Sequence, residues 1–291
     1  MERVGICYHP GLEGAHALAE RLAARASERG VDVWLAALSW EEVARELAEQ
    51  TPGSDALICV GGDGTVLHAS EVAAQAGTPL FGVRIGRLGF LCEVTEAEAE
   101  PAIDSVLSGE ARRERRSMVQ ARLNKDEPVH ALNDVVIGRR GVGHTISVGA
   151  RINGELVAEY RGDAVIVATA TGSTGYALSV GGPILHPSSA DMVLIPVAPH
   201  LSRANALVLP AAAAVELEVA RGFEAVMTVD GQVEQPVPDG AVVHVSRSPR
   251  SVDFLRLGEQ DGFYSHLALR LGWLRPDHVL GAGEGGAGAA P

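Results

Sequence analysis

The stretch Val60-Gly61-Gly62-Asp63-Gly64-Thr65 decides how the first part of this chain folds. The apolar run at 56–60 predicts a buried strand, and the pattern at 66–72 predicts a helix. Glycines let a backbone approach an anion closely, and the free N–H groups at the start of a helix point toward it. The stretch therefore predicts a phosphate-binding loop between a strand and a helix.

The loop carries a carboxylate, Asp63, where phosphate is expected to bind. Negative charge is unfavourable there unless a metal ion neutralises it or the carboxylate handles a proton, so Asp63 is a candidate general base. A tight turn without a ligand is the alternative interpretation of Gly-Gly-Asp-Gly. The sequence lacks the Gly-Lys-Ser/Thr of a P-loop and the Gly-x-Gly-x-x-Gly register of dinucleotide-binding loops.

The composition is that of an ordinary globular protein, and 291 residues are enough for two domains with a sizeable core. A net charge of -13 argues against a nucleic-acid partner or an anionic membrane surface, so an anionic nucleotide needs a local basic patch or magnesium. No segment approaches the roughly 18 consecutive apolar residues of a membrane span. Cys7, Cys59 and Cys92 fit neither a disulfide framework nor a metal site, which favours the reducing cytoplasm.

Strand and helix patterns alternate in the first third of the chain, as is typical of a parallel sheet built from βαβ units. Strands are expected at 4–8, 31–35, 56–60 and 80–83, and helices at 12–28, 40–50, 66–75 and 96–107. Ligands of such sheets bind outside the carboxyl ends of the strands, which is where the Asp63 loop lies.

The pattern changes after residues 111–116, an arginine-rich stretch that we expect to be a solvated linker, with a phosphate-steering patch as the alternative. From about 118 to 257, short alternating segments and Asn-Gly or Asp-Gly turns predict antiparallel strands. The expected fold class is an α/β N-terminal domain with a parallel sheet plus an all-β C-terminal domain. The expected divisions are 1–116, 117–260, a C-terminal helix in 261–280 that packs back on the first domain, and a disordered tail at 281–291.

A second glycine-rich segment lies inside the expected β domain, where the apolar run 164–168 enters the turn Thr171-Gly172-Ser173-Thr174-Gly175-Tyr176. Its hydroxyl groups are suited to ribose and amide groups, and a tyrosine offers an apolar face with a polar tip. A purely structural turn is an equally good interpretation of this segment alone.

The ordered set of motifs resembles the NAD kinase family, which phosphorylates the 2′-hydroxyl of the adenosine ribose of NAD to give NADP. The resemblance extends over almost the whole chain. Its motifs are Gly61-Gly62-Asp63-Gly64-Thr65, Gly86-Arg87-Leu88-Gly89-Phe90-Leu91, Leu132-Asn133-Asp134-Val135, Arg161-Gly162-Asp163, the turn at 171–176, the segment 181–187, Asp230-Gly231-Gln232 and the terminal stretch 263–273.

The resemblance implies that Asp63 is the general base, that Mg²⁺ arrives with ATP, and that ATP and NAD are the substrates. The residues implied to contact ATP phosphates are Gly61, Gly62, Gly64 and Thr65. Those implied to bind NAD are His68, Phe90, Asn133, Asp134, His144, Arg161, Asp163, Thr171, Thr174, Gly175, Tyr176, Ser179 and Gln232. No protein site for a resident metal ion is implied. Because a neighbouring subunit contributes to the dinucleotide site in this family, a homodimer or homotetramer is implied.

Some positions leave alternatives open. His68 could equally be a surface histidine of its helix, and Phe90 a core residue. Asp134 stands where the family usually has Glu, and Ala170 and Gly175 replace Pro and Ala, which leaves NADH or another nucleoside open as substrate. A lipid kinase of the same superfamily and a non-catalytic NAD sensor are competing functions. A dehydrogenase is disfavoured because no dinucleotide fingerprint is present, and the sequence does not separate ATP from polyphosphate as donor.

Overall fold

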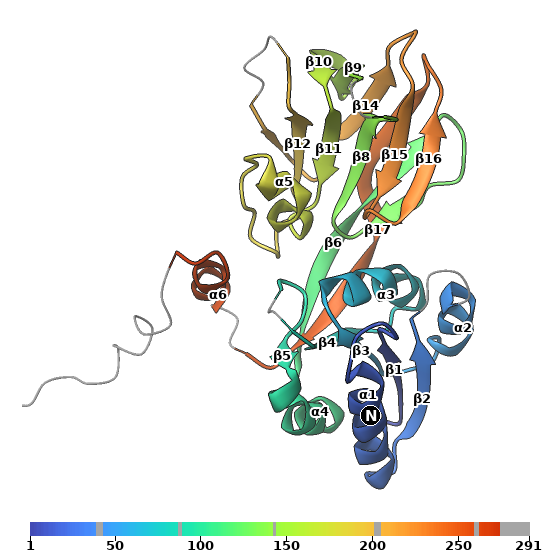
Figure 1. Ribbon diagram of the computed structural model, residues 1–291, viewed down its shortest axis with the longest axis vertical. Helices are drawn as coiled ribbons and strands as arrows, with labels where there is room; N and C mark the ends of the chain where they lie inside the picture. Colours follow the sequence, from blue (N-terminus) through green and yellow to red (C-terminus); the bar gives the residue numbers. More distant parts are fainter. Residues whose placement is uncertain (39–42, 87–88, 142–143, 201–204, 259–261, 274–291) are drawn as a thin grey trace, which may run out of the picture.

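The structure, a computed structural model, describes residues 1–38, 43–86, 89–141, 144–200, 205–258 and 262–273. Its strands form an eleven-stranded sheet and a six-stranded sheet. An α/β part lies below a β part in Figure 1, and long strands run between them. The expected fold class, parallel α/β followed by antiparallel β, is confirmed.

The α/β part is a parallel sheet in the order β4-β3-β1-β2, with helices packed on it. Its strands are β1 (Arg3–Tyr8), β2 (Asp32–Ala37), β3 (Ala56–Gly61) and β4 (Leu80–Arg84), and its helices are α1 (Ala15–Glu28), α2 (Val43–Gln50), α3 (Asp63–Ala76) and α4 (Ala99–Ser108). Every residue of β3 is buried. A strand covered on both faces reads as a continuous apolar run, which is why the sequence located β3 correctly.

Two long antiparallel strands, β6 (Arg112–Leu123) and β17 (Val242–Arg256), belong to both parts of the molecule. The end of β17 pairs in parallel with β4 through Phe254 and Leu80. Figure 1 shows both strands running from the β part into the α/β part. The expectation of a solvated linker at 111–116 is therefore wrong, because Arg112 to Arg116 pair with Arg256 to Val252 as a strand.

The β part packs the six-stranded sheet against strands of the larger sheet, and the apolar side chains between them form one core. The six-stranded sheet contains β8 (Asp134–Arg139), β11 (Ala164–Ala168), β12 (Met192–Val197), β13 (Leu207–Leu209), β15 (Ala225–Val229) and β16 (Val233–Val237). The facing strands are β9 (Ile146–Ile152), β10 (Glu155–Gly162) and β14 (Ala214–Val219), with the short β7 (Val129–Ala131) beside β6 and β5 (Val94–Thr95) beside β4.

The expected hairpin turns are present. Asn153 and Gly154 have φ of 51° and 85°, and Asp230 and Gly231 have φ of 53° and 67°. Two consecutive residues with positive φ make the turn whose twist matches that of paired strands, and Asn, Asp and Gly tolerate this conformation best.

Helix α6 (Phe263–Arg270) contacts both parts, through Phe90 below and His186 above. The expected domain boundary after residue 116 falls inside β6, and the division into domains stays a prediction. The tail at 281–291 lies outside the described residues. No helix in the described ranges has the length and apolar character needed to span a membrane.

Candidate active site

The glycine loop joins β3 to α3, and the helix begins at Asp63 itself, three residues earlier than the sequence pattern indicated. The N–H of Gly62 donates to the Thr65 hydroxyl at 3.2 Å, which caps the new helix. A Cβ on Gly61 would lie 2.1 Å from Thr65 Oγ1, whereas Cβ atoms on Gly62 and Gly64 would meet nothing within 4 Å. The Gly62–Gly64 side of the loop thus faces open space at a helix N-terminus, where an anion is favoured.

Two backbone amides hold the carboxylate of Asp63. Phe90 N–H donates to Oδ2 at 2.6 Å and Leu91 N–H donates to Oδ1 at 3.1 Å. Gly89 makes this approach possible, since a Cβ there would lie 2.1 Å from Asp63 Oδ2. Each carboxylate oxygen keeps a second lone pair, so Asp63 is oriented and can still accept a proton. Arg87 and Leu88 of the same motif lie outside the described residues.

Two residues near the loop, Cys92 and His68, have shifted pKa values. Burial, with a further contribution from the charge of Asp63, raises the pKa of the Cys92 thiol to about 12, so this thiol stays neutral. Burial, followed by the charge of His9, lowers the pKa of His68 on α3. A neutral imidazole at the loop would contact a phosphate as a hydrogen-bonding group and not as a cation.

The segment Asn133–Asp134 lies on the other side of the site, at the start of β8. The Asp230 carboxylate accepts hydrogen bonds from the N–H groups of Leu132 at 2.8 Å, Asn133 at 2.7 Å and Asp134 at 3.0 Å. Asp230 was missing from the residues singled out in the sequence, although it lies in the Asp230-Gly231-Gln232 motif. The sequence shows only an Asp-Gly turn there, and the nearest signal stops at the turn, because the Leu132 amide that Asp230 binds lies 98 residues away in the chain.

Asp134 and Asp230 are a buried carboxyl pair. Burial, and then the charge of Asp230, raises the pKa of Asp134 to about 7. Burial also raises the pKa of Asp230 to about 6, although its three backbone hydrogen bonds act to lower it. Since amide donors favour the ionised form, Asp230 ionises more readily than Asp134, and Asp134 takes up a proton first as the pH falls through about 7.

The Thr171–Tyr176 turn lies directly against Asn133. A Cβ on Gly172 would lie 2.1 Å from the Asn133 carbonyl oxygen, and one on Gly175 would lie 3.9 Å from Asn133 Nδ2. The turn folds as a short 3₁₀ segment (Gly172–Thr174) and α5 (Tyr176–Ser179). Tyr176 is 45% exposed and presents its ring to solvent. Asn133, Asp134, Thr171, Thr174 and Gly175 are thereby gathered in one place, with Gln232 on the adjoining turn.

Three of the expected residues lie elsewhere. Asp163 stands before β11, whereas Asp134 pairs with Ala168 at the far end of that strand. At about 3.3 Å per residue the two sites are roughly 15 Å apart. Asp163 pairs with Arg139 at 3.0 Å, while His144 and Arg161 are exposed. Within one chain, these residues do not join the site around Asn133.

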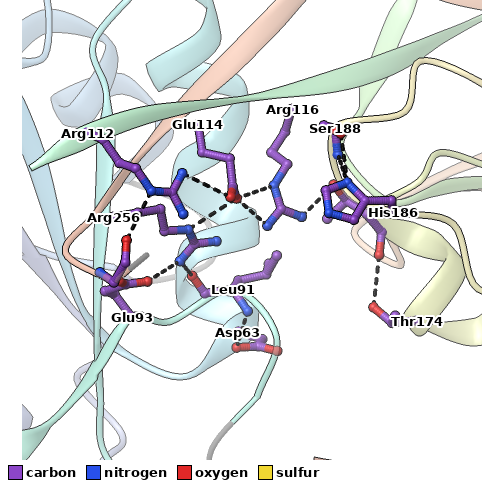
Figure 2. Close-up of polar contacts among 12 residues, drawn as sticks. Asp63, Leu91, Glu93, Arg112, Glu114, Arg116, Thr174, His186, Ser188 and Arg256 are labelled. Atoms are coloured by element: carbon purple, nitrogen blue, oxygen red, sulfur yellow. Dashed lines mark hydrogen bonds and ion pairs between the residues drawn. The ribbon is translucent and has the colours of Figure 1, made fainter. Parts of the chain in front are cut away.

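A cavity opens between the Phe90 loop, the Thr171 turn and α6, and Figure 2 shows much of its polar wall. Its volume of about 80 Å³ exceeds the ~10–15 Å³ that a single water requires. The lining residues are Phe90, Glu93, Arg112, Glu114, Arg116, Ala170, Thr171, Thr174, His186, Pro187, Arg256, Gly258, Gly262, Phe263, His266 and Arg270. Its arginines come from three segments of the chain. For the stretch 111–116 a phosphate-steering patch was the alternative interpretation, whereas Arg256 and Arg270 were not singled out.

Glu114 is the centre of that wall. It accepts hydrogen bonds from Arg116 at 2.6 Å and Arg256 at 3.2 Å, and Arg112 approaches at 3.4 Å. Burial alone would raise the pKa of Glu114, but the charges of Arg116 and Arg256 and their hydrogen bonds outweigh burial and lower it to about 2. The Arg116 guanidinium also donates to the Thr171 hydroxyl at 3.3 Å, which ties the wall to the turn beside Asn133.

Magnesium was expected to arrive with ATP. In the ranges that the structure describes, no group of three or more His, Cys, Asp or Glu side chains is arranged to hold a metal ion. The two amide donors leave free lone pairs on the Asp63 carboxylate. These lone pairs fit a contact with a Mg²⁺ ion that is held mainly by the substrate phosphates.

Comparison with known proteins identifies the family. Models of the ATP-NAD kinase N-terminal and C-terminal domains match residues 13–111 and 132–257. The NAD kinase of Heliobacterium modesticaldum is 38% identical over 87% of this chain and 91% of its own length, and that of Dehalococcoides mccartyi (strain CBDB1) is 34% identical over 93% and 96%.

Solved structures agree with this assignment. An NAD kinase from Archaeoglobus fulgidus in complex with ATP has a TM-score of 0.78 and 26% identity, with 94% of this chain and 100% of that chain covered. Yeast NADH kinase complexed with NADH has a TM-score of 0.83 at 20% identity, covering 94% and 88%, and supports the fold alone. Both family models match in order and the relatives are covered almost end to end, so this chain belongs to the NAD kinase family.

Proposed function

We propose that this chain transfers the γ-phosphate of ATP to the 2′-hydroxyl of the adenosine ribose of NAD, with Asp63 as general base. The observation that carries the proposal is the position of Asp63. Its carboxylate stands at the first residue of α3, in a loop with two glycines open to solvent, and two amides fix its orientation. A carboxylate that served only to stabilise the fold would not require an open, anion-binding loop beside it.

The reaction moves one phosphoryl group and one proton. The ribose oxygen forms a bond to the γ-phosphorus as its proton passes to Asp63, and the bond from that phosphorus to the bridging oxygen of ADP breaks. The N–H groups of the Gly61–Thr65 loop orient the donor phosphates, and Mg²⁺ enters with ATP and neutralises part of their charge. Alignment and charge stabilisation account for most of the rate in such transfers.

The acceptor half of the site consists of Asn133, Asp134 and the Thr171–Tyr176 turn. Asn133 offers an amide to the base, and Asp134 offers a carboxyl group to ribose hydroxyls. Ser179 and Gln232 flank these residues, and Phe90 lies between the two halves. His68, one turn along α3, would contact a phosphate of either nucleotide.

His144, Arg161 and Asp163 require another explanation, since each lies away from Asn133 in the single chain. We propose that they complete the dinucleotide site of a neighbouring subunit in a homodimer or homotetramer. Exposure of His144 and Arg161 supports this assignment, because a residue that serves another subunit must be accessible in the free chain. We place the enzyme in the cytoplasm, where its three buried thiols stay reduced.

The test is Asp63→Asn, assayed for NADP formation with magnesium-ATP. Loss of a general base typically costs ~10²–10⁴ in rate, so we expect kcat to fall by at least about 100-fold. NAD affinity, measured by calorimetry, should change less than about threefold. Asp126→Asn is the matched control, since Asp126 is exposed and contacts Gln235 far from the loop. Undiminished turnover by Asp63→Asn would remove Asp63 from the mechanism.

The same assay separates the competing substrates. Wild-type protein is offered NAD, NADH, adenosine and diacylglycerol in turn with ATP, and ADP release is the readout. In a parallel set polyphosphate replaces ATP, and the phosphorylated acceptor is measured instead, because this donor releases no ADP. We expect NAD with ATP to be used. Release of ADP with diacylglycerol and not with NAD would establish a lipid kinase instead.

A further inference from the structure

Helix α6 brings a cation close to the proposed base. The guanidinium of Arg270 lies 5.3 Å from the centre of the Phe90 ring. The backbone N–H of the same Phe90 donates to Asp63 at 2.6 Å. A single residue therefore separates Arg270 from the catalytic carboxylate.

Arg270 differs from the other arginines of the cavity in its partners. Arg116 and Arg256 are bound to Glu114, and Arg256 also contacts Glu93 at 3.0 Å. Among the described residues, the Nε of Arg270 is buried and has no hydrogen-bond partner. A buried polar group left unsatisfied costs about 1–3 kcal/mol, and more when it is charged. Arg270 also lines the cavity, so an oxyanion bound there would compensate the charge of its guanidinium group.

The charge of the cavity wall favours an anion. Four guanidinium groups face two carboxylates there, which is a formal excess of two positive charges. Burial, and then the charge of Arg256, lowers the pKa of Arg270, while Asp63 and Glu93 act in the opposite direction. The protein as a whole carries a net charge of -13, so the local excess of positive charge in the cavity wall does not follow from the overall composition.

We propose that Arg270 donates hydrogen bonds to the γ-phosphoryl group of ATP during its transfer and stabilises the negative charge on its oxygens. The inference rests on the proposed phosphotransfer at Asp63. Arg270 exchanges no proton, because the ribose proton goes to Asp63 and the broken bond leaves its electron pair on ADP. A planar guanidinium matches two phosphoryl oxygens at once, which a lysine ammonium does not.

The location of the cavity supports this role over that of a general anion trap. Phe90 stands on its donor side, and Thr171 and Thr174 of the acceptor turn stand on the opposite side. The group that crosses between these two sides is the phosphoryl group. An arginine supplied to the transferred phosphoryl group in GTPases increases kcat by about 10³–10⁵.

The experiment compares Arg270→Ala and Arg270→Lys with Arg140→Ala, a control at an exposed arginine that pairs only loosely with Glu224 at 3.7 Å. We expect Arg270→Ala to lower kcat at least about 100-fold, with the KM for NAD within about threefold of wild type. Arg270→Lys should recover a minor part of the loss. Added guanidinium ion should raise the rate of Arg270→Ala and of neither the wild type nor Arg140→Ala, an effect that a purely structural arginine does not produce.

The outcomes are distinct. A kcat of Arg270→Ala within threefold of wild type overturns the inference, whatever happens to ATP affinity. So does a loss of kcat that guanidinium does not restore and that the lysine variant shares in full. If wild-type protein forms no NADP, the proposed function itself fails. If wild type forms NADP and Asp63→Asn does not, while Arg270→Ala does, only the inference about Arg270 fails.

Discussion

Mutation of Glu114 tests the electrostatics of the cavity wall through the free energy of unfolding. Its pKa falls from the usual 4.5 to about 2 in the folded protein. At 1.36 kcal/mol for each pKa unit, the ionised carboxylate contributes about 3 kcal/mol to the free energy of unfolding at neutral pH. The side chain is only 18% exposed, so solvent screening reduces this value little. We expect Glu114→Gln to lower the free energy of unfolding by about 2–3 kcal/mol at pH 7.

The pKa shifts of Glu114 and Arg116 have opposite consequences for stability. Glu114 gains from ionisation, whereas burial, and then the charge of Arg256, lowers the pKa of Arg116 to about 10. The buried Arg116 is thus costly by itself and depends on Glu114 for compensation. The loss on mutation measures the removal of that compensation, and the intact pair can still add little net stability.

The pH dependence follows from the sign of the shift. A carboxyl group with a lowered pKa in the fold stabilises the protein above its unfolded pKa, and this stabilisation is lost as pH falls toward the folded pKa. The difference between wild type and Glu114→Gln should be constant between pH 6 and 8. It should shrink below about pH 4.5, and by about 1–1.5 kcal/mol at pH 3.5.

Urea unfolding followed by circular dichroism measures both effects. Glu224→Gln makes the same chemical change at an exposed carboxylate, 3.7 Å from Arg140, and should cost under ~0.5 kcal/mol. If Glu114→Gln costs no more than this control, or if its cost does not vary with pH, the account of a carboxylate held ionised by Arg116 and Arg256 is wrong.

Two further predictions concern the halves of the site. Gly89→Ala should abolish NADP formation, because its Cβ would lie 2.1 Å from Asp63 Oδ2. Gly138→Ala is the control and should keep full activity, because the nearest atom to its Cβ would be 3.8 Å away. Equal kinetics for the two variants would refute the role of Gly89. Because the pKa of Asp134 is about 7, ribose hydroxyls that donate to its ionised form should make the KM for NAD fall about tenfold from pH 6 to pH 8. Asp134→Asn should flatten that profile, and a flat wild-type profile would exclude the contact.

The sequence predicted the α/β part better than the β6 and β17 region, for a physical reason. Buried parallel strands such as β3 are continuous apolar runs, and their helices carry an apolar stripe, so each is visible locally. Strand β6 begins with charged residues that alternate between half-buried or buried and exposed positions. This pattern is explained only by the pairing with β17, which lies more than a hundred residues away. A charged segment without a visible partner is read as solvated.

The candidate site divided in the same way. Asp63 was found because it lies in a glycine-rich turn, where close backbone approach limits the possible sequences, and Asn133 was found through the family resemblance. Asp230 and Arg270 were not singled out. Their importance depends on which atoms they reach across the fold, namely the amides of Leu132 to Asp134 and the ring of Phe90.

The arginines of the cavity wall also connect the proposed donor half of the site to the proposed acceptor half. Leu91 bonds to Asp63 at 3.1 Å through its N–H and accepts from Arg256 at 3.1 Å through its carbonyl oxygen. Arg256 and Arg116 meet at Glu114, and Arg116 reaches the acceptor turn. Figure 2 shows a continuous series of polar contacts from Asp63 through Leu91, Arg256 and Glu114 to Arg116. Arg116 then donates to the Thr171 hydroxyl. Because Glu114, Arg116 and Arg256 lie on the paired strands β6 and β17, this series of contacts runs through a sheet between the proposed base and the proposed acceptor turn.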